Sequence, residues 1–117
     1  MKVLLVEHPH VAGFLIEGLH DAGHTVEVAS DDDAALALGL SRDYDVILLG
    51  LVVPKRGGIE VAAELRRAGR STPILLLIPD EHEAERLVRE AGADGYLAKP
   101  FRFEVLVERM RAVTRSG

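Results

Sequence analysis

The chain has 117 residues, of which 48% are hydrophobic, so it is long and apolar enough for one globular domain with a sizeable core. Its 19 acidic and 14 basic residues give a formal net charge of -5, which argues against a basic face that binds nucleic acid. Without cysteine there can be no disulfide, thiolate nucleophile or cysteine-based metal site, and the apolar N-terminal run is too short for a signal peptide or a membrane span. We expect a cytoplasmic, single-domain protein over 1–117, with a linker-like end at Thr114–Gly117.

Apolar runs and helical patterns alternate five times along the chain. Strands are predicted at 3–6, 25–29, 46–50, 74–78 and 95–98. Helices are predicted from about Val11 to Ala22, then after Asp31–Asp33 through Leu40, and at 59–68, 81–91 and 103–113. Strict alternation indicates βαβ units, so the sequence predicts an α/β fold, a doubly wound parallel sheet with helices on both faces.

Two of the predicted strands are apolar without interruption. Val46–Leu49 and Ile74–Ile78 show no polar alternation, which is typical of strands buried on both faces of a parallel sheet. Open α/β folds place their chemistry in the crevice at the carboxyl ends of such strands. The residue expected at the end of the middle strand is Gly50, which has no side chain to act there.

Three segments resemble the receiver domain of bacterial two-component response regulators. They are Leu4–Glu7, Tyr44–Leu49 followed by Pro54, and Gly92–Phe101, and the likeness covers nearly the whole chain in order. The resemblance implies the flavodoxin-like, CheY-like (βα)5 three-layer sandwich with strand order 2-1-3-4-5. The turn between the third strand and the next helix is expected at Pro54–Gly58.

The resemblance also implies a phosphorylation site. Receivers accept a phosphoryl group on an aspartate after the third strand, hold Mg²⁺ with that aspartate and an acidic pair, and contact the phosphoryl group with a Thr or Ser and a lysine. The matching positions form a degenerate pocket in this sequence: Glu7, His8, Gly50, Ile78 and Lys99. One carboxylate remains of three, so the sequence predicts no catalysis, no resident metal and no cofactor.

Two of these residues carry opposite charges, and a histidine pair lies beside them. We expect Lys99 to pair with Glu7 rather than to bind an anion. Glu7, His8 and His10 could form a metal site, but stacked or exposed loop histidines are the more ordinary interpretation. No G-x-G-x-x-G motif follows the first strand, which disfavours a dinucleotide enzyme.

The resemblance implies a partner face formed by the fourth helix, the fifth strand and the fifth helix. The predicted face for a symmetric homodimer comprises Arg86, Arg89, Glu90, Tyr96, Glu108 and Arg109. The alternative is a solvated helix face held by i,i+4 pairs such as Glu85 with Arg89. Gly95 and Val105 stand where one subfamily places acidic interface residues, which weighs against the dimer.

These observations predict an atypical receiver that works without phosphorylation. It would regulate transcription through dimerisation and protein contacts, as the N-terminal part of a winged-helix regulator whose DNA-binding domain lies outside this chain. The alternatives are a sensor that binds a small molecule or anion in the vacated crevice beside Gly50 and Lys99, and a stand-alone adaptor that binds a kinase or another partner. No membrane contact is expected, and no nucleic acid would bind to this domain itself.

Overall fold

The computed structural model describes residues 1–51 and 57–115, in which strands and helices alternate from end to end. Their order is β1 (Lys2–Val6), α1 (Pro9–Asp21), β2 (Thr25–Ala29), α2 (Asp32–Ser41), β3 (Val46–Gly50), α3 (Gly58–Arg67), β4 (Ile74–Ile78), α4 (Ala84–Ala91), β5 (Gly95–Ala98) and α5 (Phe103–Arg115). All strand pairs are parallel, and the sheet order is β2-β1-β3-β4-β5. The predicted fold class and strand order are confirmed. Most of the predicted turn at Pro54–Gly58 lies outside the described residues.

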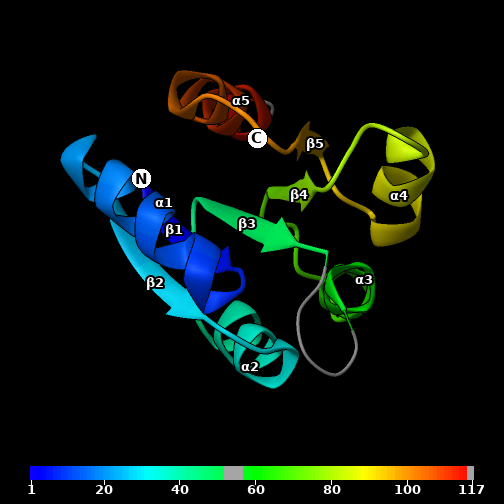
Figure 1. Cartoon of the computed structure of the whole chain (residues 1–117). Coiled ribbons are helices and arrows are strands. Elements are labelled where there is room, and N and C mark those ends of the chain that lie inside the picture. Colours follow the sequence, from blue (N-terminus) through cyan, green and yellow to red (C-terminus); the bar gives the residue numbers. More distant parts are fainter. Residues whose placement is uncertain (52–56, 116–117) are drawn as a thin grey trace.

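The helices cover both faces of the sheet, as Figure 1 shows: α1 and α5 lie on one face, and α2, α3 and α4 on the other. Alternate residues of the central strands feed two separate cores. In β4, Ile74, Leu76 and Ile78 belong to the core under α2, α3 and α4, whereas Leu75 and Leu77 belong to the core under α1 and α5. This explains why β3 and β4 are apolar without interruption: neither face of these strands meets water.

Local signals fix where α1 and α2 begin. The Nδ1 atom of His8 accepts a hydrogen bond from the backbone N–H of His10, and Pro9 follows at the first helical position, where its missing N–H costs nothing. Asp31 caps α2 by accepting from the backbone N–H of Ala34 at 2.8 Å. Each carboxyl or imidazole acceptor satisfies a donor that the first turn would otherwise leave unpaired.

The fourth helix is shorter than the sequence predicts. It was expected from Glu81, but it begins at Ala84. Glu83 adopts a left-handed backbone with φ of 59°, which a right-handed helix cannot include, and Asp80 accepts from the backbone N–H of His82 at 2.8 Å in the preceding turn. The correction matters because the residues before Ala84 border the expected partner face.

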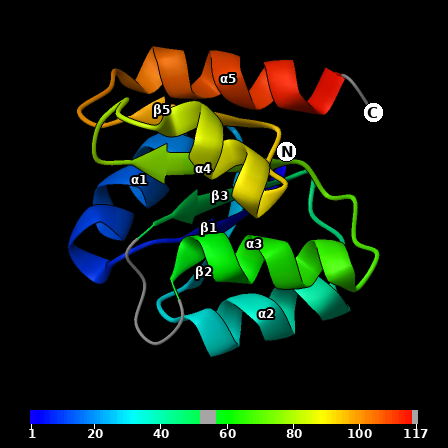
Figure 2. The ribbon, with the colours of Figure 1, turned by 90° about the vertical axis from the view of Figure 1, so that its right-hand side faces the viewer.

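One edge of the molecule is formed by β5, which lies between α4 and α5 in Figure 2. β5 pairs only with β4 among the described strands, so its other side is an edge of the sheet. Among the described residues, no helix combines the length and the apolar composition that crossing a bilayer requires.

Gly58 allows α3 to begin directly against the end of β3. A Cβ atom at residue 58 would lie 2.2 Å from the backbone oxygen of Gly50, a contact that no side chain can relieve by moving. The backbone N–H of Gly58 also donates to Leu51 O at 2.9 Å. The start of α3 therefore fixes the path of the chain at the carboxyl end of β3.

We predict that Gly58→Ala lowers the free energy of unfolding by about 1–3 kcal/mol, because the backbone must shift to accommodate one methyl group. Gly13→Ala is the matched control, since a Cβ atom in that exposed turn of α1 meets nothing within 4 Å and should raise stability by up to about 1 kcal/mol. Urea unfolding of both variants measures the difference. Equal stabilities would contradict the close contact.

Candidate functional site

The carboxyl ends of four strands bring together the residues that the sequence analysis assigned to one site. Glu7 follows β1, Gly50 ends β3, Ile78 ends β4 and Lys99 follows β5. The strand register places them at the same edge, because Val6 pairs with Leu49 and Ile78 pairs with Ala98. His8 comes next to Glu7 as the N-cap of α1.

An ion pair between Glu7 and Lys99 joins the two sides of this edge. Lys99 Nζ lies 2.8 Å from Glu7 Oε2, so the predicted pairing is confirmed. Glu7 Oε1 also accepts from the backbone N–H of His8 at 3.0 Å. The Glu7 side chain is only 4% exposed, whereas that of Lys99 is 33% exposed. Both carboxylate oxygens thus have donors, as a buried charge requires.

The Glu7 carboxylate lies directly over Gly50. A Cβ atom built on residue 50 would be 2.7 Å from Glu7 Oε1 and 2.9 Å from both Cδ and Oε2. Any side chain at residue 50 would therefore overlap the carboxylate. The space that the sequence analysis expected to be vacated is filled by the residue that follows the neighbouring strand.

Ile78 is fully buried and belongs to the core beneath α2, α3 and α4. Its backbone oxygen accepts from the N–H of Lys99 at 2.8 Å, which holds the start of the Lys99 loop against β4. The peptide bond between Lys99 and Pro100 is cis. An isoleucine at this position supplies packing and no hydroxyl donor.

His8 and His10 stack on each other at the start of α1, with ring centroids 4.9 Å apart and planes 19° apart. This matches the ordinary interpretation of stacked loop histidines. No group of three or more His, Cys, Asp or Glu side chains that could hold a metal occurs among the described residues. His8 acts as the N-cap of α1 through its Nδ1 atom.

The predicted partner face lies along α4, β5 and α5. Arg86 pairs with Glu83 and, at 2.6 Å, with Glu90, so its guanidinium is held within α4. Hydrogen bonding to Arg86 holds the pKa of the Glu83 carboxyl below its usual value. The expected pair of Glu85 with Arg89 is wrong for the described residues, since the ion pairs of α4 converge on Arg86.

Two other residues of this face meet across β5 and α5. Arg109 Nη1 donates to the backbone oxygen of Tyr96 at 2.8 Å, which ties α5 to the edge strand. Arg89, Glu90 and Glu108 are exposed. Dimerisation through these residues stays a prediction.

Sequence reasoning missed an exposed aromatic residue close to the site. Phe14 on α1 is 76% exposed, and it lines a groove with Lys99 and Phe101. A signal was present: Phe14 falls outside the inward stripe of Val11, Leu15 and Leu19, so a large apolar side chain was to be expected on the outer surface. What the pattern could not show is that the loop after β5 lies opposite this residue.

A five-stranded parallel sheet with helices on both faces and a lysine ion pair at its carboxyl edge defines an α/β signalling domain of the receiver type. The family model described as the response regulator receiver domain matches residues 3–111. The chain belongs to this family.

Similar proteins and a similar solved structure agree with this family assignment. The chain is 39% identical over 121 residues to the transcriptional regulatory protein CusR of Escherichia coli, covering 100% of this chain and 52% of CusR. It is 37% identical over 119 residues to the transcriptional regulatory protein TcrA of Mycobacterium tuberculosis, covering 100% and 47%. The receiver domain of the Francisella response regulator 1452 superposes with a TM-score of 0.90 at 28% identity, covering 98% of this chain and 97% of that one. The chain spans about half the length of the curated relatives it matches.

We predict that Lys99→Met lowers the free energy of unfolding at neutral pH by about 1–3 kcal/mol, because it leaves the buried Glu7 carboxylate without its ammonium partner. Adding Glu7→Gln to this variant should recover part of the loss, since a neutral amide has no charge to compensate. A double-mutant cycle from urea unfolding gives the coupling between the two residues. Additive effects of the two substitutions would contradict a stabilising pair.

Proposed function

We propose that this chain is a receiver domain that works without phosphorylation and regulates transcription through dimerisation and protein contacts. One observation carries the proposal: residue 50 is a glycine, and the Glu7 carboxylate, paired with Lys99, lies where a side chain at that residue would be. A carboxylate nucleophile is what phosphoryl transfer to a receiver needs, and none stands at the end of β3.

The ion pair between Glu7 and Lys99 gives a physical reason why the domain would hold a single conformation. In a phosphorylated receiver, the lysine ammonium balances the charge of the phosphoryl group. Here Lys99 meets a permanent carboxylate at 2.8 Å, so its charge is balanced at all times. The domain would then hold one conformation, and its regulation would come from partners or ligands.

A role in transcription is supported by the relatives. CusR and TcrA are named transcriptional regulatory proteins, and each is about twice as long as the segment that this chain matches. By this analogy, a DNA-binding domain would occupy the remaining length of the whole protein. The net charge of -5 fits a domain that leaves DNA contact to another part.

Dimerisation would use the edge formed by α4, β5 and α5. Its exposed charges of both signs, Arg89, Glu90 and Glu108, suit a two-fold interface in which each copy contributes the same patch. The bond from Arg109 to Tyr96 O would keep α5 in place against β5 when the second copy binds.

The proposal predicts that acetyl phosphate with Mg²⁺ leaves the intact mass of the protein and its sedimentation coefficient unchanged. Mg²⁺ alone should leave the melting temperature unchanged, because two of the three family carboxylates are absent and Glu7 already has its donors. Mass spectrometry, sedimentation velocity and thermal melting test the three statements. A phosphoryl adduct that peptide mapping places at the carboxyl edge of the sheet, on Glu7 or a residue beside it, would overturn the proposal.

Restoring an aspartate gives a second prediction. Gly50→Asp should be less stable than Gly50→Asn, because two carboxylates about 4 Å apart repel by roughly 4 kcal/mol at an effective dielectric near 20. The two side chains have the same shape, so the difference in free energy of unfolding isolates the charge. Mg²⁺ should narrow this difference, since the cation would then have two carboxylates to bind.

Gly50→Asp should also fail to restore switching. Even if the aspartate accepts a phosphoryl group, Ile78 has no hydroxyl to donate to it, and its side chain is committed to the core. The sedimentation coefficient should therefore stay the same with and without acetyl phosphate. A Gly50→Asp protein that changes oligomeric state on phosphorylation would show that the hydroxyl position is not required.

A further inference from the structure

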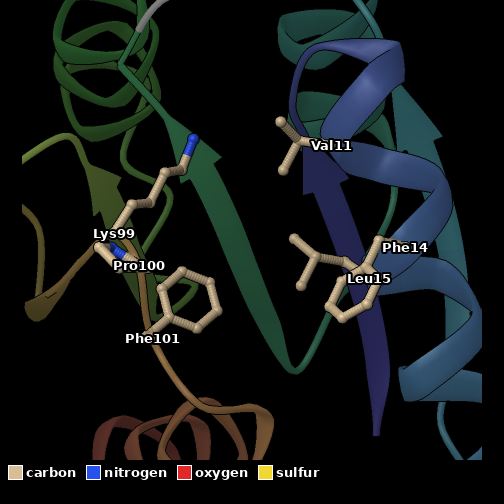
Figure 3. Close-up of a pocket in the computed structure, with 6 residues that line it drawn as sticks. All are labelled: Val11, Phe14, Leu15, Lys99, Pro100 and Phe101. Atoms are coloured by element: carbon tan, nitrogen blue, oxygen red, sulfur yellow. The ribbon is translucent and has the colours of Figure 1, made fainter.

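A groove opens beside Lys99, between α1 and the loop after β5. Its volume is about 300 Å³, and it is lined by Val11, Phe14, Leu15, Lys99, Pro100 and Phe101. Figure 3 shows the three α1 residues on one side and Lys99, Pro100 and Phe101 on the other, facing each other across the space. Among the described residues that line the groove, Lys99 alone carries a charge.

The two aromatic residues stand on opposite walls. Phe14 belongs to α1 and is 76% exposed, although the inward residues of that helix, such as Leu15 and Leu19, are fully packed. Phe101 belongs to the loop and is half-buried against the core under α1 and α5. A flat ring placed between them would contact an aromatic face or edge on either side.

The third element of the groove is the Lys99 ammonium. It has three N–H donors, of which one meets Glu7 Oε2. Its charge is already balanced by that carboxylate at 2.8 Å, so a ligand anion would leave a net negative charge beside the groove, and the repulsion of Glu7 would offset part of the attraction of Lys99. An uncharged oxygen acceptor takes a hydrogen bond from Lys99 without this repulsion.

The size of the groove limits the ligand. A volume of about 300 Å³ lies at the lower end for small-molecule sites, which suits a compound of two fused rings rather than a nucleotide. Its lining is apolar apart from one donor, so a sugar or a phosphate would lose more hydration than the groove returns in hydrogen bonds.

We propose that this groove binds a small, flat, uncharged aromatic ketone or quinone, with its carbonyl oxygen accepting from Lys99 and its rings lying between Phe14 and Phe101. The site lies beside the crevice over Gly50, which Glu7 fills, and its binding reaction is independent of phosphorylation. A ligand here would connect α1 to the loop between β5 and α5, and that loop joins two elements of the proposed dimer face.

The test is a titration of the isotopically labelled protein with 2-acetylnaphthalene, followed by amide chemical shifts. We expect saturable shifts in α1 and in residues 99–103, with a dissociation constant below about 1 mM. 2-Ethylnaphthalene, which lacks the carbonyl, and 2-naphthoate, which carries a charge, should each bind several-fold more weakly. Tighter binding of 2-naphthoate would overturn the uncharged class of ligand.

Variants localise the site. Phe14→Ala should raise the dissociation constant of 2-acetylnaphthalene by about tenfold. Because Phe14 is exposed, the variant should keep the fold. Lys99→Arg should keep the ion pair with Glu7 but weaken the binding of 2-acetylnaphthalene, because the guanidinium places its N–H donors elsewhere. Leu40→Ala is the matched control, an exposed apolar residue of α2 on the other face of the sheet, and it should leave binding unchanged. Unchanged binding in Phe14→Ala, or the absence of any saturable shift, would overturn the site.

Discussion

The ion pair between Glu7 and Lys99 is the contact on which the carboxyl edge of this sheet depends. It joins residues 92 positions apart in the sequence, at the ends of β1 and β5, and β3 and β4 lie between these two strands in the sheet. Because Glu7 is buried, the fold is committed to supplying a cation at residue 99. The hydrogen bond from Lys99 N to Ile78 O holds that cation in place through the backbone.

The glycine at residue 50 leaves room for the carboxylate of this pair. A Cβ atom on residue 50 would lie 2.7 Å from Glu7 Oε1 and 2.9 Å from Oε2, so a side chain there would require the carboxylate to shift. Gly50 and the Glu7–Lys99 contact therefore belong to one arrangement. Gly58 belongs to the same arrangement, because the lack of a side chain there lets α3 begin against the backbone oxygen of Gly50. Replacing one of these residues changes the constraints on the others.

Much of this architecture can be predicted from local sequence. The uninterrupted apolar runs of β3 and β4 indicate burial on two faces, and the pairing of Lys99 follows from Glu7 being the nearest carboxylate that the resemblance offers. The missed features all depend on competition between neighbours or on contacts across the fold. Glu83 leaves the helical region and shortens α4. The ion pairs described within α4 join Arg86 to Glu83 and Glu90, and nothing in the local sequence explains why Glu85 and Arg89 do not pair as well. The groove requires Phe14 and Phe101 to face each other, which no single segment reveals.

The position of the free space bears on how such a domain could still respond to a signal. The crevice over Gly50 is closed by a carboxylate whose oxygens both have donors, so a second anion there would have to break a buried contact. Binding in the groove between α1 and Phe101 would not break this contact, since Lys99 can donate another hydrogen bond while it stays paired with Glu7. Lys99 thus retains N–H donors at the surface while it stays paired with Glu7. Those donors lie on the loop leading into α5, which is where a bound molecule could influence the face formed by α4, β5 and α5.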